Sequence, residues 1–448
     1  MNSYIGLDIG TSAVKGALIC EDGRVLAVCS KEFEYYNKLE GKLMQPQYFV
    51  DACRKVINHL AQSSGDSCVR AICPCCASGN LILLDENNQP LTPIIGWQSK
   101  VDTEDFKRYY TKEELDEIYS LCGWGAGASF PIAYLPWLKE NKKELFEKTQ
   151  MFCMSAEYLN FVFTGKWGIS HSMGTPFYLM NQEKGCYNAK LLKKLGIDEK
   201  KLPPIYDKGT VLGTVLPNSG LNVPPHTKVV LGSFDHPSGA TGAGVYNCGE
   251  MLLSCGTSWV EFFPVETREK AMNAGFLTDR YMLDGAPYCV MTSLESVSIK
   301  IDRIREHYFG KISHREFDEY AALAKKGCNG LEFDFTESDF LKGEGFEKCD
   351  IARAITEAAA KLLKKNLDEV KKKGLLADKI TMIGGISNSD TCVKIIAQIL
   401  EQDIHVVNGV SAGAVGAAML AAIGAGTFKN ERDAYSNMHF EVKTIKYK

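Results

Sequence analysis

Short apolar segments near the start of the chain are typical of β-strands. Residues 4–8 (YIGLD) are apolar up to an aspartate and lead into Gly-Thr-Ser, residues 14–20 alternate in part, and residues 24–30 follow a Glu-Asp-Gly turn. Turn residues of this kind between apolar segments favour a hairpin. The chain is therefore predicted to open as strand, polar turn, strand, turn, strand.

The pattern then changes to helical spacing. Residues 47–61 carry apolar side chains at helical intervals, and residues 103–165 are more polar and predicted to be largely helical. A helix after Asp350 is predicted to use that residue as its N-cap. Strands are predicted at residues 69–73, 81–84, 227–231, 379–383 and 404–407. Strands that alternate with helices predict an α/β fold with mixed or parallel sheets.

A short motif occurs twice. Residues 7–12 (LDIGTS) and residues 253–258 (LSCGTS) agree in four of six places, more than half a chain apart, and each lies between two predicted strands. A repeat at this distance predicts a duplicated domain, with one turn facing a common cleft from each side. We therefore predict two domains, residues 1–246 and 247–448.

Composition limits the class of protein. The 448 residues are 45% hydrophobic and 24% charged, as in globular proteins, and the net charge of −4 does not favour nucleic acid as a partner. The longest run of small and apolar residues, 412–426, is shorter than the ~20 residues of a membrane span, so it predicts a buried helix. The sixteen scattered cysteines and the lack of a signal-like N-terminus indicate reduced thiols and a cytoplasmic protein.

The first Gly-Thr-Ser turn suits a phosphate and its metal ion. Asp8 ends a strand and can hold a hydrated Mg²⁺, Thr11 and Ser12 offer hydroxyl and backbone N–H donors, and Lys15 adds positive charge. An ordinary turn explains the same residues. The second copy, Gly256 and Thr257, favours the functional interpretation, because two facing turns can grip a polyphosphate from both sides.

Two further strand ends carry candidate chemistry. Gly384 and Gly385 lie between a strand and a helix and allow a ligand to approach the backbone closely, with Asn388 near the helix start. Asp235 follows an apolar strand and is placed to accept a proton from a substrate hydroxyl, with His236 beside it. The alternatives are N-cap roles for Asn388 and Asp235 and a structural role for His236.

The chain resembles the FGGY family of carbohydrate kinases. The resemblance rests on five segments in the family's order: residues 8–12, Trp97-Gln98 after PLTPIIG, residues 232–236 running into GATGAGV, residues 254–258, and MIGG with ISNSD. It spans nearly the whole chain. It implies an α/β fold of two actin-like (RNase H-like) domains around a central cleft, and ATP- and Mg²⁺-dependent phosphorylation of a sugar, polyol or sugar acid.

The resemblance also implies roles by position. Asp235 would be the general base, and Asp8 would hold Mg²⁺ through water. The residues expected along the ATP phosphates are Thr11, Ser12, Lys15, Gly256 and Thr257; those near the nucleoside are Gly384, Gly385 and Asn388; those at the substrate are Trp97, Gln98, Asp235 and His236. The first domain would carry the sugar site and the second the nucleotide site. The expected partner is a small sugar or polyol, without nucleic acid or membrane, and a homodimer is left open.

The chain departs from the family pattern mainly on the sugar side. A Trp-x-Asp-x-Arg segment common in the family reads Trp97-Gln98-Ser99-Lys100-Val101, and the Met-His of xylulokinase-like members is replaced by Ser78-Gly79. These changes leave the substrate undetermined. The alternatives to an active kinase are a nucleotide-binding relative with a regulatory or chaperone-like role and a sugar sensor without turnover. The presence of Asp235 favours the kinase.

Overall fold

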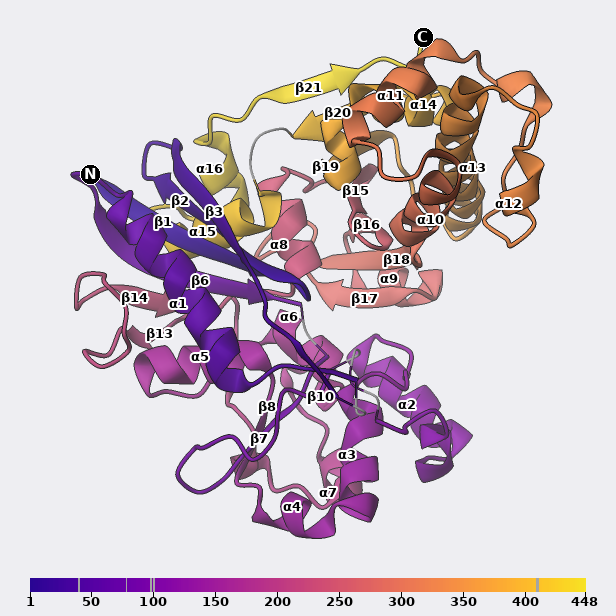
Figure 1. Ribbon diagram of the computed structural model, residues 1–448. Coiled ribbons are helices and arrows are strands. Elements are labelled where there is room, and N and C mark those ends of the chain that lie inside the picture. Colours follow the sequence, from indigo (N-terminus) through magenta and orange to yellow (C-terminus); the bar gives the residue numbers. More distant parts are fainter. Residues whose placement is uncertain (39–40, 78, 97–98, 100, 408–410) are drawn as a thin grey trace.

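The structure is a computed structural model that describes residues 1–38, 41–77, 79–96, 99, 101–407 and 411–448. Each half of the chain forms one large mixed β-sheet (Figure 1). The first sheet has the order β13 (Val211–Thr214), β14 (Lys228–Val230), β6 (Cys68–Cys76), β1 (Asn2–Ile9), β2 (Ala13–Cys20), β3 (Val25–Glu32). The second has the order β17 (Leu277–Arg280), β18 (Tyr288–Leu294), β16 (Trp259–Val265), β15 (Glu250–Cys255), β19 (Lys379–Gly384), β20 (Ile404–Val407), β21 (Val442–Ile445).

The two sheets share one plan. In the first, β1 runs antiparallel to β2 and parallel to β6, and β6 runs parallel to β14. In the second, β15 runs antiparallel to β16 and parallel to β19, and β19 runs parallel to β20. The repeated Gly-Thr-Ser turns join β1 to β2 and β15 to β16. The duplication predicted from the short motif is therefore present in the strand topology.

Helices cover both faces of the first sheet. Helix α1 (Pro46–Gln62) begins with a proline in its first turn and packs the apolar side chains predicted from its spacing, among them Val56 and Leu60, against β2 and β3. The other face is covered by α15 (Ala412–Ala425), which is buried over most of its length. Its glycines and alanines allow close approach, since a Cβ on Gly6 of β1 would lie 2.0 Å from the Ala414 carbonyl oxygen.

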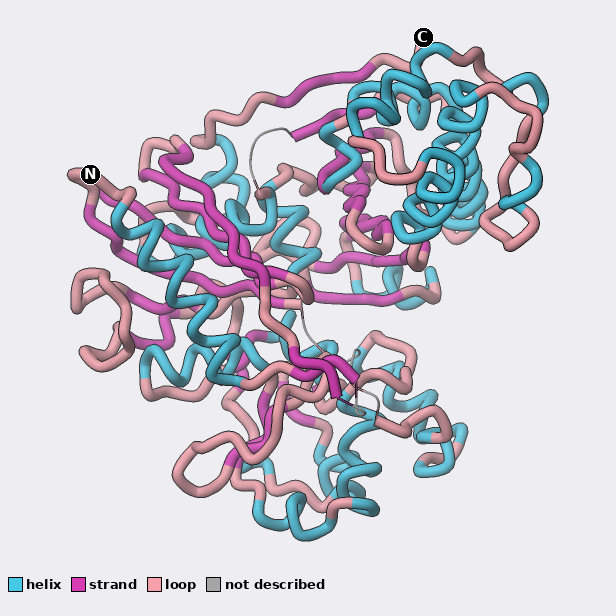
Figure 2. Tube along the Cα trace, viewed as in Figure 1, coloured by secondary structure: helices cyan, strands magenta, loops and turns pink. Residues whose placement is uncertain are grey.

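A helical lobe extends from the first half, between β6 and β14 in the chain (Figure 2). It confirms the predicted helical character of residues 103–165, although a short strand interrupts the helices. Its elements include β7 (Ile82–Leu84), α2 (Lys112–Cys122), α3 (Pro131–Asn141), α4 (Lys143–Lys148), β8 (Met151–Cys153), α5 (Ser155–Thr164), α6 (His171–Gly174), the 3-10 turn η2 (Thr175–Phe177) and α7 (Ala189–Leu195).

The second half adds its own helices and corrects one prediction. They are α9 (Arg268–Ala274), α10 (Val297–Phe309), α11 (His314–Leu323), α12 (Asp339–Lys342), α13 (Lys348–Lys372), α14 (Asp390–Leu400) and α16 (Glu431–Ser436). Asp350 is not the N-cap of α13: Glu347 holds that position. Asp350 lies in the first turn of α13 and accepts a hydrogen bond of 2.8 Å from Asn329. The aspartate that was predicted to cap the helix therefore makes a tertiary contact instead.

The halves are joined by two crossing helices. Helix α8 (Asp235–Gly242) leads out of the first sheet, and α15 returns to it from the second half. A Cβ on Gly242 would lie 1.9 Å from the Ala412 carbonyl oxygen, so the helices meet backbone to backbone. In the sequence, the first sheet lies before residue 246 and the second sheet after it, but α15 from the second half packs on the first sheet. The division into domains at residue 246 stays a prediction.

Two further predictions concern the state of the cysteines and the presence of a membrane-spanning helix. All sixteen cysteines lie in the described residues and are free, and those of the CPCC segment are buried in β6. No described helix has the length and hydrophobicity that crossing a bilayer requires.

Candidate active site

The candidate site begins where three parallel strands of the first sheet end. Ile9 of β1 pairs with Cys76 of β6, and Cys76 forms a parallel bridge with Phe234, four residues beyond β14. Carboxyl ends of parallel strands meet at one edge of a sheet, which is the usual place for ligands in α/β folds. Asp8 and Asp235 are therefore brought to the same edge from opposite ends of the first half.

Asp8 is a half-buried carboxylate under two opposing influences. Burial and the neighbouring charge of Asp235 raise the pKa of Asp8 to about 6, while Lys15 acts in the opposite direction. Lys15 stands directly opposite Asp8 in the β1–β2 register, on the same face of the sheet. Because the charge of Asp235 acts on Asp8, the negative potential at this edge of the sheet favours a cation.

The start of α15 closes the other side of Asp8. A Cβ on Gly413 would lie 2.5 Å from Asp8 Oδ2, so only glycine leaves room for the carboxylate. The Ser238 hydroxyl of α8 donates a 2.8 Å hydrogen bond to the Gly413 carbonyl oxygen. The crossing of α8 and α15 therefore fixes the backbone beside Asp8.

Asp235 is the first residue of α8, and Phe234 is the N-cap. The alternative that Asp235 caps the helix is therefore wrong. Its Oδ1 accepts a 2.9 Å hydrogen bond from the backbone N–H of His236, and the ring Nε2 of His236 lies 4.0 Å away. The Asp235 side chain is 21% exposed, so it is held by the protein and still open to a substrate.

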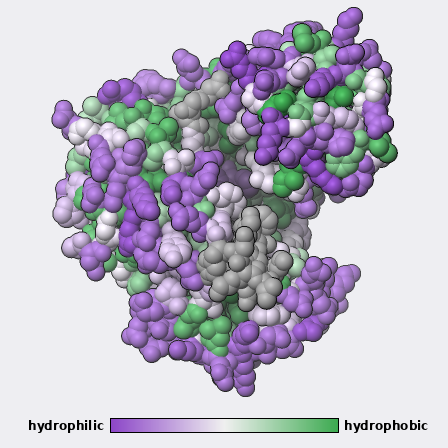
Figure 3. All heavy atoms as spheres, viewed as in Figure 1, coloured by the Kyte–Doolittle hydropathy of each residue, from purple (hydrophilic) through white to green (hydrophobic). Residues whose placement is uncertain are grey.

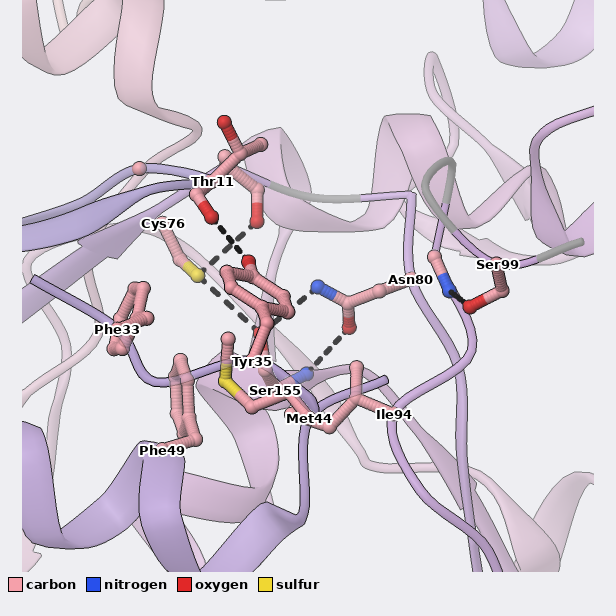
Figure 4. A pocket seen from close by; sticks show the side chains of 13 residues that line it. Thr11, Phe33, Tyr35, Met44, Phe49, Cys76, Asn80, Ile94, Ser99 and Ser155 are labelled. Atoms are coloured by element: carbon pink, nitrogen blue, oxygen red, sulfur yellow. Dashed lines mark hydrogen bonds between the residues drawn. The ribbon is translucent and has the colours of Figure 1, made fainter. Parts of the chain in front are cut away.

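A pocket lies beside these strand ends (Figure 4). Apolar side chains form much of its wall, and Asn80 and Ser155 provide polar groups that hydrogen-bond each other, with Asn80 Nδ2 3.0 Å from Ser155 Oγ. This mixture suits a small polar molecule with a carbon skeleton. The pocket is lined by Gly10, Thr11, Phe33, Tyr35, Met44, Phe49, Cys76, Ala77, Asn80, Ile94, Gly96, Ser99 and Ser155.

The first Gly-Thr-Ser turn is tied back through its carbonyl groups. The Tyr35 hydroxyl donates to the Thr11 carbonyl oxygen, as Figure 4 shows, and the Phe33 N–H donates to the Ser12 carbonyl oxygen at 2.9 Å. The Thr11 side chain is half-buried and Ser12 is exposed. The turn thus directs its acceptors into the protein and leaves its hydroxyl groups for a ligand.

The second turn is built in the same way. The Ser298 hydroxyl donates to the Gly256 carbonyl oxygen at 2.6 Å, and the Ser298 N–H donates to the Thr257 carbonyl oxygen at 3.2 Å. Gly256 and Thr257 are themselves exposed. The chain therefore presents two similar turns, one from each sheet, and Figure 3 shows that the surface is hollowed between the lobe carrying α10–α13 and the rest of the molecule.

Gly384 and Gly385 lie next to the second turn, because Gly384 pairs with Cys255 across β15 and β19. Gly384 has a φ of +102°, and a Cβ there would lie 2.3 Å from the Cys255 carbonyl oxygen. Glycine is thus required at this position. Asn388 is exposed in the following 3-10 turn, and Ser389 is the N-cap of α14, accepting a 3.0 Å hydrogen bond from the Cys392 N–H. The capping alternative for Asn388 is therefore wrong.

Some of the predicted site residues lie outside the described part of the chain, and some residues of the site were not predicted from the sequence. Trp97 and Gln98 lie outside the described residues, as do Ser78 and Lys100. The pocket residues Tyr35, Asn80 and Ser155, and Gly413 beside Asp8, were not predicted. They come from separate parts of the chain, and only the glycine-rich start of the apolar run at 412–426 gave a signal that such contacts exist.

The chemistry of the site fits a magnesium ion shared with phosphates. The described residues contain no group of three or more His, Cys, Asp or Glu side chains that would hold a metal alone. Mg²⁺ is usually bound through one or two carboxylates, water and substrate phosphates. Asp8, with its raised pKa and a second carboxylate nearby, meets that requirement.

Comparison with known families decides the class of protein. The model of the N-terminal domain of the FGGY family of carbohydrate kinases matches residues 3–242, more than half of the chain, and the model of the C-terminal domain matches residues 321–425. The chain belongs to the FGGY family of carbohydrate kinases. The protein is accordingly an enzyme, an ATP-dependent carbohydrate kinase, as the resemblance of its motifs to the family implied.

Individual FGGY relatives are distant in sequence but match nearly the whole chain. Xylulose kinase of Bacillus subtilis is 26% identical over 96% of this chain and 90% of its own length, and L-fuculokinase of Escherichia coli is 23% identical over 98% and 95%. The crystal structure of gluconate kinase from Lactobacillus acidophilus matches with a TM-score of 0.86 at 22% identity, covering 100% of this chain and 94% of that one. The predicted fold of two actin-like domains is confirmed.

Proposed function

We propose that the protein transfers the γ-phosphoryl group of ATP to a hydroxyl of a sugar, polyol or sugar acid, with Asp235 as the general base. The substrate hydroxyl oxygen forms a bond to the γ-phosphorus, the bond from that phosphorus to the β–γ bridging oxygen breaks, and ADP leaves. The hydroxyl proton passes to the Asp235 carboxylate. In a loose transition state this proton leaves late, so position matters more than basicity.

One observation carries the proposal. Asp235 and Asp8 are close enough for the charge of the first to raise the pKa of the second, and both lie at the strand ends that border the pocket. Asp235 lies at the strand ends beside the pocket and its side chain is partly open to a substrate, and Asp8 is suited to a cation. Transfer of a phosphoryl group to an alcohol requires both functions: a group that accepts the hydroxyl proton and a cation that neutralises charge on the phosphates.

We assign the remaining residues by their location. Asp8 would hold Mg²⁺ through water, and the ion would neutralise charge on the phosphates. Thr11, Ser12 and Lys15 would contact the phosphates from the first sheet, and Gly256 and Thr257 from the second. The nucleoside is assigned to the turn of Gly384, Gly385 and Asn388. The substrate is assigned to the pocket and to His236 beside Asp235, with Trp97 and Gln98 as further contacts.

The test is a kinase assay with matched variants. ADP release would be measured with MgATP and a panel of ketoses, aldoses, polyols and aldonates for the wild type, Asp235→Asn and Glu144→Gln. Glu144 is an exposed carboxylate in the first turn of α4 and serves as the control. We expect turnover of one compound class, a kcat about 10²–10⁴-fold lower in Asp235→Asn, and no change in Glu144→Gln.

Calorimetric titration with MgADP would separate chemistry from binding. Asp235→Asn should bind the nucleotide as the wild type does, because the substitution lies on the substrate side. If Asp235→Asn keeps its turnover, Asp235 is not the base. If a slow ATPase activity is all that appears with every compound, a sugar sensor or nucleotide-binding regulator is the better description.

A further inference from the structure

A buried carboxylate of the second sheet is bonded to residues of the first half. Asp279 lies on the edge strand β17 and has no exposed surface. Its Oδ2 accepts a 2.7 Å hydrogen bond from Ser172 Oγ, and its Oδ1 accepts bonds of 2.8 Å from Thr175 Oγ1 and from the Arg280 N–H. Ser172 and Thr175 belong to α6 and η2, so this carboxylate links the two halves of the molecule.

Ser172 extends this link to the residue before Asp235. Besides donating to Asp279, Ser172 Oγ accepts a 3.2 Å hydrogen bond from the backbone N–H of Phe234. A hydroxyl has one proton, so its donation to the carboxylate leaves only its lone pairs to face Phe234. The bonds are therefore directional: the Phe234 N–H at the N-cap of α8 donates to Ser172 Oγ, and the Ser172 hydroxyl donates to Asp279.

The position of Phe234 determines where Asp235 points. Phe234 is the extended N-cap residue and Asp235 is the first helical residue, so a shift of the Phe234 peptide turns the Asp235 side chain. The Phe234 ring is packed edge to face against Trp124, with ring centroids 5.5 Å apart, and against His236 at 5.1 Å. The ring is thus held by packing, and the Ser172 hydroxyl holds its backbone N–H.

We propose that Ser172 and Asp279 are positioning residues for phosphoryl transfer: Asp279 orients the Ser172 hydroxyl, which fixes the Phe234 backbone and so aims the Asp235 carboxylate. The inference rests on the proposed role of Asp235. Through this link the second sheet, whose Gly256-Thr257 turn is assigned to the phosphates, sets the direction of the base on the first sheet. The base and the phosphate site are then aligned by one buried connection.

Thr175 provides a control within the same network. It donates to the same carboxylate as Ser172, is equally buried, and makes no hydrogen bond to Phe234. Ser172→Ala and Thr175→Val each remove one hydrogen bond to Asp279. Both should lower the urea midpoint of unfolding, whereas only Ser172→Ala releases the Phe234 N–H.

The experiment compares kcat and KM for wild type, Ser172→Ala, Thr175→Val, Asp279→Asn and Asp235→Asn with the substrate found in the panel. We expect kcat to fall about 10- to 100-fold in Ser172→Ala, with the KM for MgATP unchanged, and to stay near the wild-type value in Thr175→Val. Asp279→Asn keeps the side-chain shape and should lower kcat as Ser172→Ala does. It therefore tests the same positioning role if Ser172→Ala folds poorly.

The outcomes separate this inference from the function on which it rests. Equal kcat values for Ser172→Ala and Thr175→Val, or unchanged kcat in Ser172→Ala and Asp279→Asn beside an inactive Asp235→Asn, would overturn the positioning role and leave Asp235 as the base. An active Asp235→Asn would overturn the proposed base itself.

Discussion

Gly413 and Asp8 touch where α15 begins beside the end of β1. A methyl group on Gly413 would lie 2.5 Å from Asp8 Oδ2 and would displace the carboxylate. We expect Gly413→Ala to lower kcat by more than about tenfold, because displacement of a reacting or metal-holding group by a fraction of an ångström is costly. The overpacking should also lower the free energy of unfolding by about 1–3 kcal/mol. Steady-state kinetics and urea unfolding measure the two effects.

The same helix offers a matched control for this prediction. A Cβ on Gly424 would lie 2.7 Å from the Gly209 carbonyl oxygen and from Val230, away from the carboxylates. Gly424→Ala should therefore lose a similar amount of stability and keep its kcat. Equal losses of kcat in Gly413→Ala and Gly424→Ala would mean that activity follows stability and that the Asp8 contact is unimportant.

Individual residues of the site were predictable only where the sequence is locally unusual. Asp8 lies just before the first of two similar Gly-Thr-Ser turns between strands, and Gly384 ends a strand. Asn80 and Ser155 show no comparable pattern. They meet only because β6, α5 and the connecting segments fold together, and that juxtaposition has no short-range signal.

At the scale of elements, Glu261 of β16 gives a prediction about pH. Its side chain is fully buried against α13, where Asn366 Nδ2 lies 2.7 Å from Oε2, and burial raises the pKa of Glu261 to about 8. The folded protein therefore keeps a proton that the unfolded chain releases above a pH of about 4.3. The free energy of unfolding should fall by up to about 1.4 kcal/mol per pH unit between that pH and 8 because of this group.

Glu261→Gln removes this ionisation and nearly preserves the shape. Relative to the variant, the wild type should lose about 2–4 kcal/mol of stability between pH 5 and pH 8, measured by urea unfolding. Glu369→Gln, an exposed position on α13, serves as the control and should follow the wild type. Parallel pH profiles for wild type and Glu261→Gln would contradict the buried, protonated state.

Most elements with strong periodicity were predicted, and the errors have physical causes. The strands β1, β2, β3, β19 and β20 and the helix α1 follow their apolar patterns because each packs one continuous surface. Asp350 resembled a cap, yet tertiary contact with Asn329 explains it better. The partnership of Asp279 on β17 with Ser172 was invisible in the sequence, since a buried carboxylate is not distinguishable there from an exposed one.

At the scale of the whole molecule, the order of motifs predicted two actin-like domains, but not how the chain crosses between them. Helix α15 belongs to the second half by sequence and covers the first sheet in space, as Figure 1 shows. It packs against apolar residues of the first half that would otherwise face water: Tyr4, Ala17, Ile19, Ala71, Cys73 and Val230. A boundary at residue 246 therefore separates the sheets without separating their cores.

This crossing predicts how fragments behave. Residues 1–246 alone would leave one face of the first sheet uncovered, and exposed apolar surface of that kind favours association. We expect the fragment to aggregate or to unfold without cooperativity, as judged by size-exclusion chromatography and urea unfolding followed by circular dichroism.

Joining residues 411–438, which contain α15 and α16, to the fragment through a flexible Gly/Ser linker should restore a monomer with a cooperative transition. The same linker joined to residues 348–372, the amphipathic helix α13, should not, because α13 packs on the second half. A cooperative, monomeric 1–246 fragment would show instead that the first domain is independent of α15 and that residue 246 is a true domain boundary.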